Sequence, residues 1–487
     1  MKKSLKVTLI VVLVLLLVLG SALTVFLIMR GKKASNTGKE NDYSNLALKS
    51  VITNDDKKVI SELTDKNKST TVDFTNGKSL FFNFDSPVTL NTITLSEIIN
   101  KKDEKDPQYK GGIKKFSIYA DVDSKETLIY QNDKVESYRL CSFDTITTKS
   151  VKITFDDCRS GAKIAEAELY LAEKQKKDFR VNDYIVLNTD KRYGDDEEFK
   201  QYLDSVTDLT LFIAVRMGGR NGIRFNESKE IFEERLADIK KAVGDRDIKL
   251  YCNILSEGPE ASFFTGKTEL FAKGAADFLV KYDLDGVDID WEYPQNAADW
   301  KEYNNLVIDM HKAFEPIGKK LSVATAAWSA NFSTEAREAI DYYNVMIYDL
   351  TGSDFDNYHA TFQVAVNDIT TMLNKGYKSE KLLLGVPFYG REIKKSDPDR
   401  KATWTDYTDS GITTKWDNVK YTIKDDGTKI ESDYFNGYAL MADKTAYAIA
   451  QNLGGMMIWQ MDTDMPMSSE LSLHRAIGHT INERILK

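Results

Sequence analysis

The stretch Leu284-Asp-Gly-Val-Asp-Ile-Asp-Trp-Glu-Tyr-Pro294 decides the fold of this chain. It predicts a β-strand, in which side chains alternate between two faces and neighbours on one face lie about 6.6 Å apart. Asp288, Asp290 and Glu292 therefore share one face. The residues between them are apolar, so a solvated acidic strand does not fit. In the wall of a (β/α)8 barrel the two aspartates point into the interior. Glu292 then emerges at the C-terminal rim, where such barrels carry their chemistry.

Three carboxyl groups on one face predict acid–base catalysis. Like charges a few ångström apart raise at least one carboxyl pKa. A raised carboxyl pKa is what a general acid needs at neutral pH. Burying three acids costs several kcal/mol, which only a function offsets. The alternative to catalysis is that the same aspartates form a divalent-cation site of the Asp-x-Asp type. The spacing of the acids excludes one such site, the EF-hand loop.

The regions around this strand alternate between strand and helix, which predicts the α/β class. Helical patterns cover residues 227–243, 267–281 and 300–314. Eight βα units in residues 179–487 predict a (β/α)8 TIM barrel, and residues 392–442 form an insertion after its seventh strand. The eight strands are expected to start near Tyr184, Leu209, Lys249, Gly286, Leu321, Tyr343, Leu382 and Gly455. The insertion contains Trp404, Trp416 and several tyrosines, so we expect it to wall a cleft.

A separate β domain precedes the barrel. Residues 45–172 hold short β-branched and aromatic runs between polar turns, which predicts an antiparallel β-sandwich. Residues 173–178 are polar and predict a linker to the barrel. Cys141 and Cys158 both fall in the β domain, where a disulfide and two free thiols are equally compatible with the sequence.

The N-terminus predicts a membrane anchor. Residues 7–29 contain no charged side chain, and 23 such residues are long enough to cross a bilayer as a helix. We expect residues 1–30 to form an uncleaved transmembrane signal anchor, followed by a flexible linker over residues 31–44. The polar bulk of the chain then lies outside the cell, held on the membrane as a single-pass protein. Secretion after signal cleavage is the alternative.

The composition limits which classes of molecule this protein is expected to bind. The 487 residues carry a net charge of −9, and an acidic surface repels phosphate backbones, which disfavours nucleic acid. A neutral polysaccharide fits this charge. The three cysteines and four histidines form no metal-binding motif, so neither a metal site nor histidine-based catalysis is expected.

The acidic strand closely resembles the fourth-strand signature of family-18 glycoside hydrolases, the chitinase family. That signature is Asp-Gly-x-Asp-x-Asp-x-Glu, and residues 285–292 match it in full. The stretches Met346-Ile-Tyr-Asp349 and Leu384-Gly-Val-Pro-Phe-Tyr-Gly-Arg391 are similar to the family's sixth and seventh strands. The stretch Gly454-Gly-Met-Met-Ile-Trp459 resembles its eighth. In the β domain, residues 45–48, 149–155 and 164–171 resemble discoidin-like (coagulation factor type C) domains.

The family-18 resemblance implies retaining, substrate-assisted hydrolysis without a metal or organic cofactor. Glu292 protonates the glycosidic oxygen, and the acetamido group of the −1 sugar attacks its own anomeric carbon. Asp290 orients that acetamide, Asp288 shares a proton with Asp290, and Tyr348 donates to the acetamido oxygen. Asp349 holds sugar hydroxyls or the attacking water, and Trp459 stacks under the −1 ring. The remaining expected substrate-binding residues are Tyr389, Arg391, Met346 and Met457.

Two departures from the family pattern affect the walls of the −1 subsite. Asn253 stands where the third strand usually carries a serine, and the first strand lacks the expected inward aromatic after Tyr184. Asp285 falls on the opposite face from the triad and is expected to form a structural turn.

The leading function is hydrolysis of β-1,4-linked N-acetylglucosamine chains by a chitinase-like enzyme. Peptidoglycan or the cores of N-glycans are alternative substrates. A carbohydrate-binding lectin on an inactive barrel is the alternative of another class, although such relatives have usually lost the acid that Glu292 provides.

Overall fold

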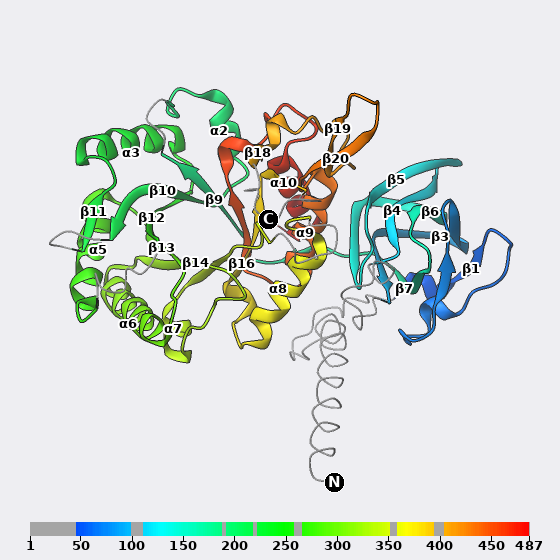
Figure 1. Cartoon of the computed structure of the whole chain (residues 1–487), viewed down its shortest axis with the longest axis horizontal. Coiled ribbons are helices and arrows are strands. Elements are labelled where there is room, and N and C mark those ends of the chain that lie inside the picture. Colours follow the sequence, from blue (N-terminus) through cyan, green and yellow to red (C-terminus); the bar gives the residue numbers. More distant parts are fainter. Residues whose placement is uncertain are drawn as a thin grey trace, which may run out of the picture.

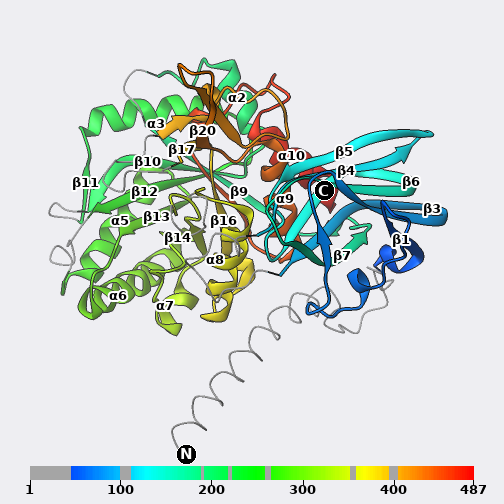
Figure 2. The ribbon, with the colours of Figure 1, turned by 45° about the vertical axis from the view of Figure 1, so that its right-hand side comes forward.

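The computed structural model describes residues 45–98, 111–187, 191–217, 222–257, 265–350, 358–393 and 404–486. A β domain and a barrel lie side by side in this structure (Figures 1 and 2). Residues 1–44, which include the expected anchor and the first linker, lie outside the described residues. Among the described residues, no helix is long and apolar enough to cross a membrane.

The barrel has eight parallel strands and is closed, because its first strand pairs with both the second and the last. This confirms the predicted (β/α)8 fold, and each strand contains or adjoins its expected start. The strands are β9 (Arg180–Val186), β10 (Asp208–Met217), β12 (Lys249–Glu257), β13 (Gly286–Glu292), β14 (Lys320–Thr325), β15 (Tyr342–Val345), β16 (Leu382–Pro387) and β21 (Gly455–Trp459). A short extra strand, β11 (Ile223–Phe225), pairs antiparallel with β10.

Helices surround the barrel (Figure 1). Several begin at side chains that cap the first free backbone amides, as Ser228, Asn296 and Thr361 do. Their apolar faces pack on the strands and bury the core. The helices are α2 (Glu197–Leu203), α3 (Lys229–Val243), α5 (Thr268–Tyr282), α6 (Ala297–Phe314), α7 (Thr334–Ala339), α8 (Phe362–Asn374), α9 (Tyr438–Ala450) and α10 (Leu473–Arg484).

The insertion after the seventh strand forms its own antiparallel sheet. In spatial order its strands are β18 (Trp404–Asp406), β17 (Tyr389–Glu392), β20 (Lys429–Tyr434) and β19 (Val419–Ile423). The chain then enters α9. This confirms an insertion between the seventh strand and its helix, although its sheet begins at Tyr389, before the expected bounds of 392–442, and α9 begins at Tyr438, inside them.

The β domain is one hydrogen-bonded antiparallel sheet of seven strands, which confirms the antiparallel prediction. Its arrangement as a two-layer sandwich stays a prediction. The strands are β1 (Ser50–Asn54), β2 (Val72–Phe74), β3 (Lys78–Glu97), β4 (Ile113–Val122), β5 (Lys125–Asp133), β6 (Arg139–Cys158) and β7 (Ala162–Tyr170). Cys141 and Cys158 lie near opposite ends of β6, and both are free thiols.

The predicted second linker, residues 173–178, contains a strand of two residues. This strand, β8 (Gln175–Lys176), pairs in parallel with β22 (Ile485–Leu486) at the end of the chain. The connection between the two domains is therefore tied to the C-terminal segment.

Candidate active site

Strand β13 carries the acidic triad in the expected arrangement. Asp288 is completely buried, Asp290 is 4% exposed, and Glu292 is exposed at the end of the strand. Because β13 runs inside a parallel barrel, its last residue lies at the C-terminal rim. Asp285 lies before the strand, and its carboxylate accepts from the Leu250 backbone amide at 2.9 Å, consistent with the expected structural role.

Asp288 accepts hydrogen bonds from uncharged donors on four different strands. Tyr184 Oη (2.7 Å) and Asn253 Nδ2 (2.8 Å) donate to one carboxylate oxygen. Ser322 Oγ (2.7 Å) and Asn344 Nδ2 (2.9 Å) donate to the other. An ionised carboxylate accepts about four hydrogen bonds, so the pocket suits a carboxylate held in one orientation.

One of the two departures noted in the sequence falls in this network, and Tyr184, which precedes the other, belongs to it as well. Asn253 donates to Asp288 from the third barrel strand, the position at which the sequence departs from the family's serine. Tyr184 points into the barrel from the first strand, and burial beside Asp288 and Asp290 raises its pKa well above the ordinary value. Its hydroxyl therefore remains a donor.

The sequence analysis did not identify Ser322 and Asn344. A signal was present, because each is a polar residue inside an otherwise apolar strand run. Alternation alone does not say that both reach the same carboxylate, since β14 and β15 contribute them separately.

Tyr348 lies just beyond β15. Burial, with the charges of Asp290 and Glu292 adding to it, raises its pKa well above 10. The Tyr348 hydroxyl lies 3.9 Å from the Met457 sulfur. Met457 is fully buried and Met346 is 8% exposed, in an apolar cluster beside the triad. Direct contact of either methionine with a substrate stays a prediction.

Asp349, Tyr389 and Arg391 form one cluster. Asp349 Oδ1 accepts from Tyr389 Oη and from Arg391 Nε, each at 2.7 Å, and Arg391 Nη2 lies 2.5 Å from Oδ2. Burial raises the pKa of Asp349, but these donors and the positive charge of Arg391 outweigh it and hold the pKa below the usual value. Asp349 is therefore an ionised, oriented acceptor whose side chain is still 41% exposed.

Aromatic rings adjoin the acids. Trp459 packs edge-on against Phe212, with centroids 4.5 Å apart, and lies 5.6 Å from Tyr184. Trp404 of the insertion stacks on Tyr389 at 4.0 Å and is 39% exposed, and its expected role in walling a cleft stays a prediction.

A second aromatic pair stands near the acid. Trp328 is 63% exposed and packs at 4.8 Å against Tyr293, the residue after Glu292. The sequence analysis did not identify Trp328. Large exposed rings next to a carboxylate site suit stacking against sugar rings.

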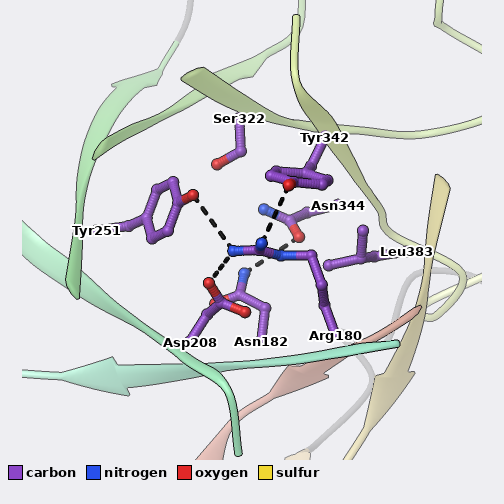
Figure 3. A pocket seen from close by; sticks show the side chains of 8 residues that line it. All are labelled: Arg180, Asn182, Asp208, Tyr251, Ser322, Tyr342, Asn344 and Leu383. Atoms are coloured by element: carbon purple, nitrogen blue, oxygen red, sulfur yellow. Dashed lines mark hydrogen bonds and ion pairs between the residues drawn. The ribbon is translucent and has the colours of Figure 1, made fainter. Parts of the chain in front are cut away.

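A second polar cluster lies where barrel strands begin, because Arg180, Asp208 and Tyr342 are the first residues of β9, β10 and β15. Figure 3 shows its side chains. Arg180 forms an ion pair with Asp208 and donates to the hydroxyls of Tyr342 (3.0 Å) and Tyr251 (3.3 Å). Within the described part of the chain, no group of acidic, histidine or cysteine side chains could hold a metal ion.

Comparison with known proteins agrees with this geometry. The chain matches Glycosyl hydrolases family 18 over residues 189–464, more than half of its length. The fold and the acid-bearing strand define a glycosidase. The chain belongs to glycosyl hydrolase family 18.

Its relatives include chitinases from several kingdoms. It is 28% identical over 248 residues to "Probable chitinase 2" of Drosophila melanogaster, covering 40% of this chain and 50% of the relative. It is 27% identical over 266 residues to "Chitinase 1" of Aphanocladium album, covering 45% and 62%. The chain thus spans about half the length of the curated relatives it matches.

Solved structures share the barrel fold. The Group IV chitinase of Ostrinia furnacalis aligns with a TM-score of 0.51 and 20% identity, over 63% of this chain and all of that one. At this identity the likeness concerns the fold.

Proposed function

We propose that this protein is a retaining glycoside hydrolase that cleaves β-1,4-linked N-acetylglucosamine chains, with Glu292 as acid and base. The observation that carries the proposal is the arrangement on β13. A fully buried Asp288 is held by four donors, a nearly buried Asp290 follows it, and an exposed Glu292 ends the strand. Membership of family 18 and the chitinase names of the relatives support the substrate class.

In this proposal the substrate supplies the nucleophile. Glu292 protonates the oxygen of the scissile bond, and the acetamido oxygen of the −1 sugar attacks the anomeric carbon to form an oxazolinium ion. Asp290 accepts from the acetamido N–H. As the family resemblance implies, Asp288 shares a proton with Asp290, and its four donors hold the carboxyl group in one orientation. Glu292, now ionised, then activates the water that opens the ring, which gives retention.

Other side chains stabilise the charge that develops on the substrate and hold the substrate in position. The Tyr348 hydroxyl keeps its proton at any working pH and donates to the acetamido oxygen as charge develops there. Asp349, ionised and oriented by Arg391, accepts from sugar hydroxyls or from the attacking water. Trp459 supports the −1 ring, and the exposed rings of Trp404 and Trp328 offer further stacking surfaces.

We further propose an extracellular site of action on the cell surface. The support is the uncharged run of residues 7–29 and a polymer substrate too large to enter a cell. The discoidin-like assignment of the β domain belongs to the same proposal and is supported by the antiparallel pairing of β7 in the domain's sheet.

The test is product analysis by mass spectrometry. The protein is incubated separately with chitin oligomers, peptidoglycan and an N-glycoprotein, beside Glu292→Gln as the matched control. Because Glu292 is exposed at a strand end, the isosteric amide leaves the fold intact. We expect N-acetylglucosamine products from chitin oligomers and less than about 1% residual activity in the variant, a loss of more than about 3 kcal/mol of transition-state stabilisation.

Each other outcome would reject or change a stated part of the proposal. Residual activity above that level rejects Glu292 as the acid. Cleavage of peptidoglycan or N-glycans alone moves the proposal to those substrates. Sugar binding without cleavage of any substrate favours a lectin. An α-anomer in the first product, seen by NMR, contradicts retention.

A further inference from the structure

The β domain is docked on the barrel through buried charged groups. Asp443 of α9 is fully buried and accepts from the Arg139 guanidinium (3.0 Å), the Tyr130 hydroxyl (2.5 Å) and the Ser142 amide (2.8 Å), all in the β domain. Arg139 is 2% exposed. Asp443 and Arg139 both lie in the contact between the domains, and removing either side chain would leave the other buried without its partner. The β domain is therefore fixed in place.

The insertion also contacts the β domain. Its Trp416 packs against the β-domain core, and Asn418 Nδ2 donates to Asn132 Oδ1 at 2.7 Å. Tyr434, on β20, donates its hydroxyl to Asp133 Oδ2 at 2.9 Å. One part of the insertion thus places Trp404 on Tyr389, and another forms a contact with the β domain that the sequence analysis did not predict.

Tyr434 connects this contact to the segment of residues 358–360. Its ring stacks on Tyr358, with centroids 4.3 Å apart and planes 9° apart. Its backbone carbonyl accepts from His359 Nε2 at 3.0 Å. On the β-domain side, Lys134 Nζ lies 4.3 Å from the centre of the Tyr358 ring. Two neighbouring β-domain residues, Asp133 and Lys134, therefore hold the two stacked tyrosines.

Helix α9 provides a second connection. Lys444, next to Asp443, is fully buried and donates to the Ala360 carbonyl (2.7 Å) and to Asn436 Oδ1 (2.5 Å). Ala360 has a left-handed φ of 55°, which needs support from its surroundings. The same turn of α9 thus faces the β domain with one residue and the 358–360 segment with the next.

The 358–360 segment adjoins the catalytic cluster. His359 is fully buried, with its ring centre 5.5 Å from that of Tyr389 and its Nδ1 3.9 Å from Asp349 Oδ1. Burial lowers the pKa of His359 to about 4, so the imidazole is neutral near pH 7. Nε2 donates to a carbonyl and therefore carries the hydrogen. The ring packs beside Tyr389 and Asp349 and limits their movement on this side.

We propose that the β domain is a fixed support of the catalytic site, in which Asp133, Lys134 and Arg139 act as positioning residues that hold His359 beside Asp349 and Tyr389. The domain thereby contributes to substrate binding without touching the sugar. Its expected effect on kinetics rests on the proposed function, because Asp349 and Tyr389 matter only if this cleft binds the substrate.

The test is a comparison of two interdomain changes in the full chain. The first is the double variant Tyr434→Phe with Lys134→Met, which keeps both side-chain shapes and removes one hydroxyl and one charge at the support. The second, a matched control, is Asp144→Asn. It weakens the contact between Asp144 Oδ1 and His479 Nε2 (2.7 Å), which crosses the same interface but ends on α10. If the double variant does not fold, Tyr434→Phe alone takes its place.

Two measurements are made on each variant. Hydrogen–deuterium exchange of the amides in residues 358–362 should become at least threefold faster in the double variant and stay unchanged in the control. With chitin oligomers, KM should rise about fivefold in the double variant while kcat changes less than twofold, and the control should keep both values.

The exchange result separates this proposal from the proposed function. Faster exchange in the double variant alone supports the proposal that the β domain holds this segment in place, even if no substrate is cleaved. Equal exchange in wild type and double variant, or equal acceleration in the control, overturns it. Faster exchange with unchanged KM in an active enzyme also overturns it, because the segment would then be supported without serving the site.

Discussion

The two polar clusters inside the barrel differ in how their charge is balanced. At the N-terminal end the charge of Arg180 is matched by Asp208, and two tyrosine hydroxyls complete the cluster (Figure 3). Further inside the barrel Asp288 is held by four uncharged donors, with Asp290 two residues further along the same strand toward the C-terminal end. Buried charges that neutralise each other describe a structural cluster. Acids gathered with neutral donors describe a site built for chemistry.

Breaking the catalytic cluster should have the largest effect. In Asp288→Asn, one carboxylate oxygen becomes an amide nitrogen, which donates and no longer accepts, and the side chain can no longer take up the proton shared with Asp290. We expect kcat/KM to fall about a thousandfold, roughly 4 kcal/mol of transition-state stabilisation. Steady-state kinetics on chitin oligomers measures this. A loss below about tenfold would contradict the role of Asp288.

Breaking the structural cluster should change stability and leave activity. Arg180→Met keeps the apolar stem but leaves the Asp208 carboxylate buried and without its cation. The free energy of unfolding should fall by about 3 kcal/mol, as for other buried pairs that lose one partner. Urea unfolding measures the loss. The kcat of the remaining folded protein should stay within twofold, and a tenfold drop would mean that the two clusters are not distinct.

Asn344 links the two clusters, because it forms hydrogen bonds with residues of both. It donates to Asp288 (2.9 Å) and Tyr184 (3.1 Å). Its carbonyl oxygen accepts from Asn182 (3.1 Å), which lines the Arg180 cluster. Asn344→Ala should cost about 1–3 kcal/mol of stability and about tenfold in kcat. Ser322→Ala is the control, because Ser322 lines the same pocket but its hydroxyl makes one hydrogen bond, to Asp288, and the change should cost less of both. Thermal unfolding and kinetics on the same samples report the two effects.

The smallest predicted effect is a dependence of the free energy of unfolding on pH, which arises from a third buried cluster. His474 is fully buried, with Nδ1 and Nε2 each 2.7 Å from a carboxylate oxygen of Asp464 and Asp183. Burial alone lowers the pKa of His474, but the two carboxylates outweigh it and raise the pKa to about 9. A folded pKa above the ordinary 6.5 means that the stabilisation is complete below about pH 6.5 and is lost as pH rises through 9.

The expected loss between pH 7 and pH 10 is about 1–3 kcal/mol in the free energy of unfolding. Burial also raises the pKa of Asp183 to about 6, which acts at lower pH and leaves this window unchanged. His474→Gln should flatten the curve relative to wild type, because glutamine does not titrate. Parallel curves for the two proteins in this window would contradict a protonated His474.

Much of the barrel was predictable from local patterns. Each strand start was readable because a parallel strand is a short apolar run, and the shared face of Asp288, Asp290 and Glu292 follows from the period of two. The Tyr389–Asp349–Arg391 cluster was less accessible. The sequence placed its members on two expected strands, yet their mutual hydrogen bonds depend on how those strands and the insertion meet.

The sequence by itself determined the class of this protein, because the spacing of three acids and eight strand–helix repeats are local properties of the chain. Only the tertiary structure decided what holds Asp288, since its donors at positions 184, 253, 322 and 344 come from four strands that barrel closure brings together. It also decided that the β domain is fixed to the barrel. The contact between Arg139 and Asp443 joins residues 304 positions apart, and no local pattern records a pairing over that distance.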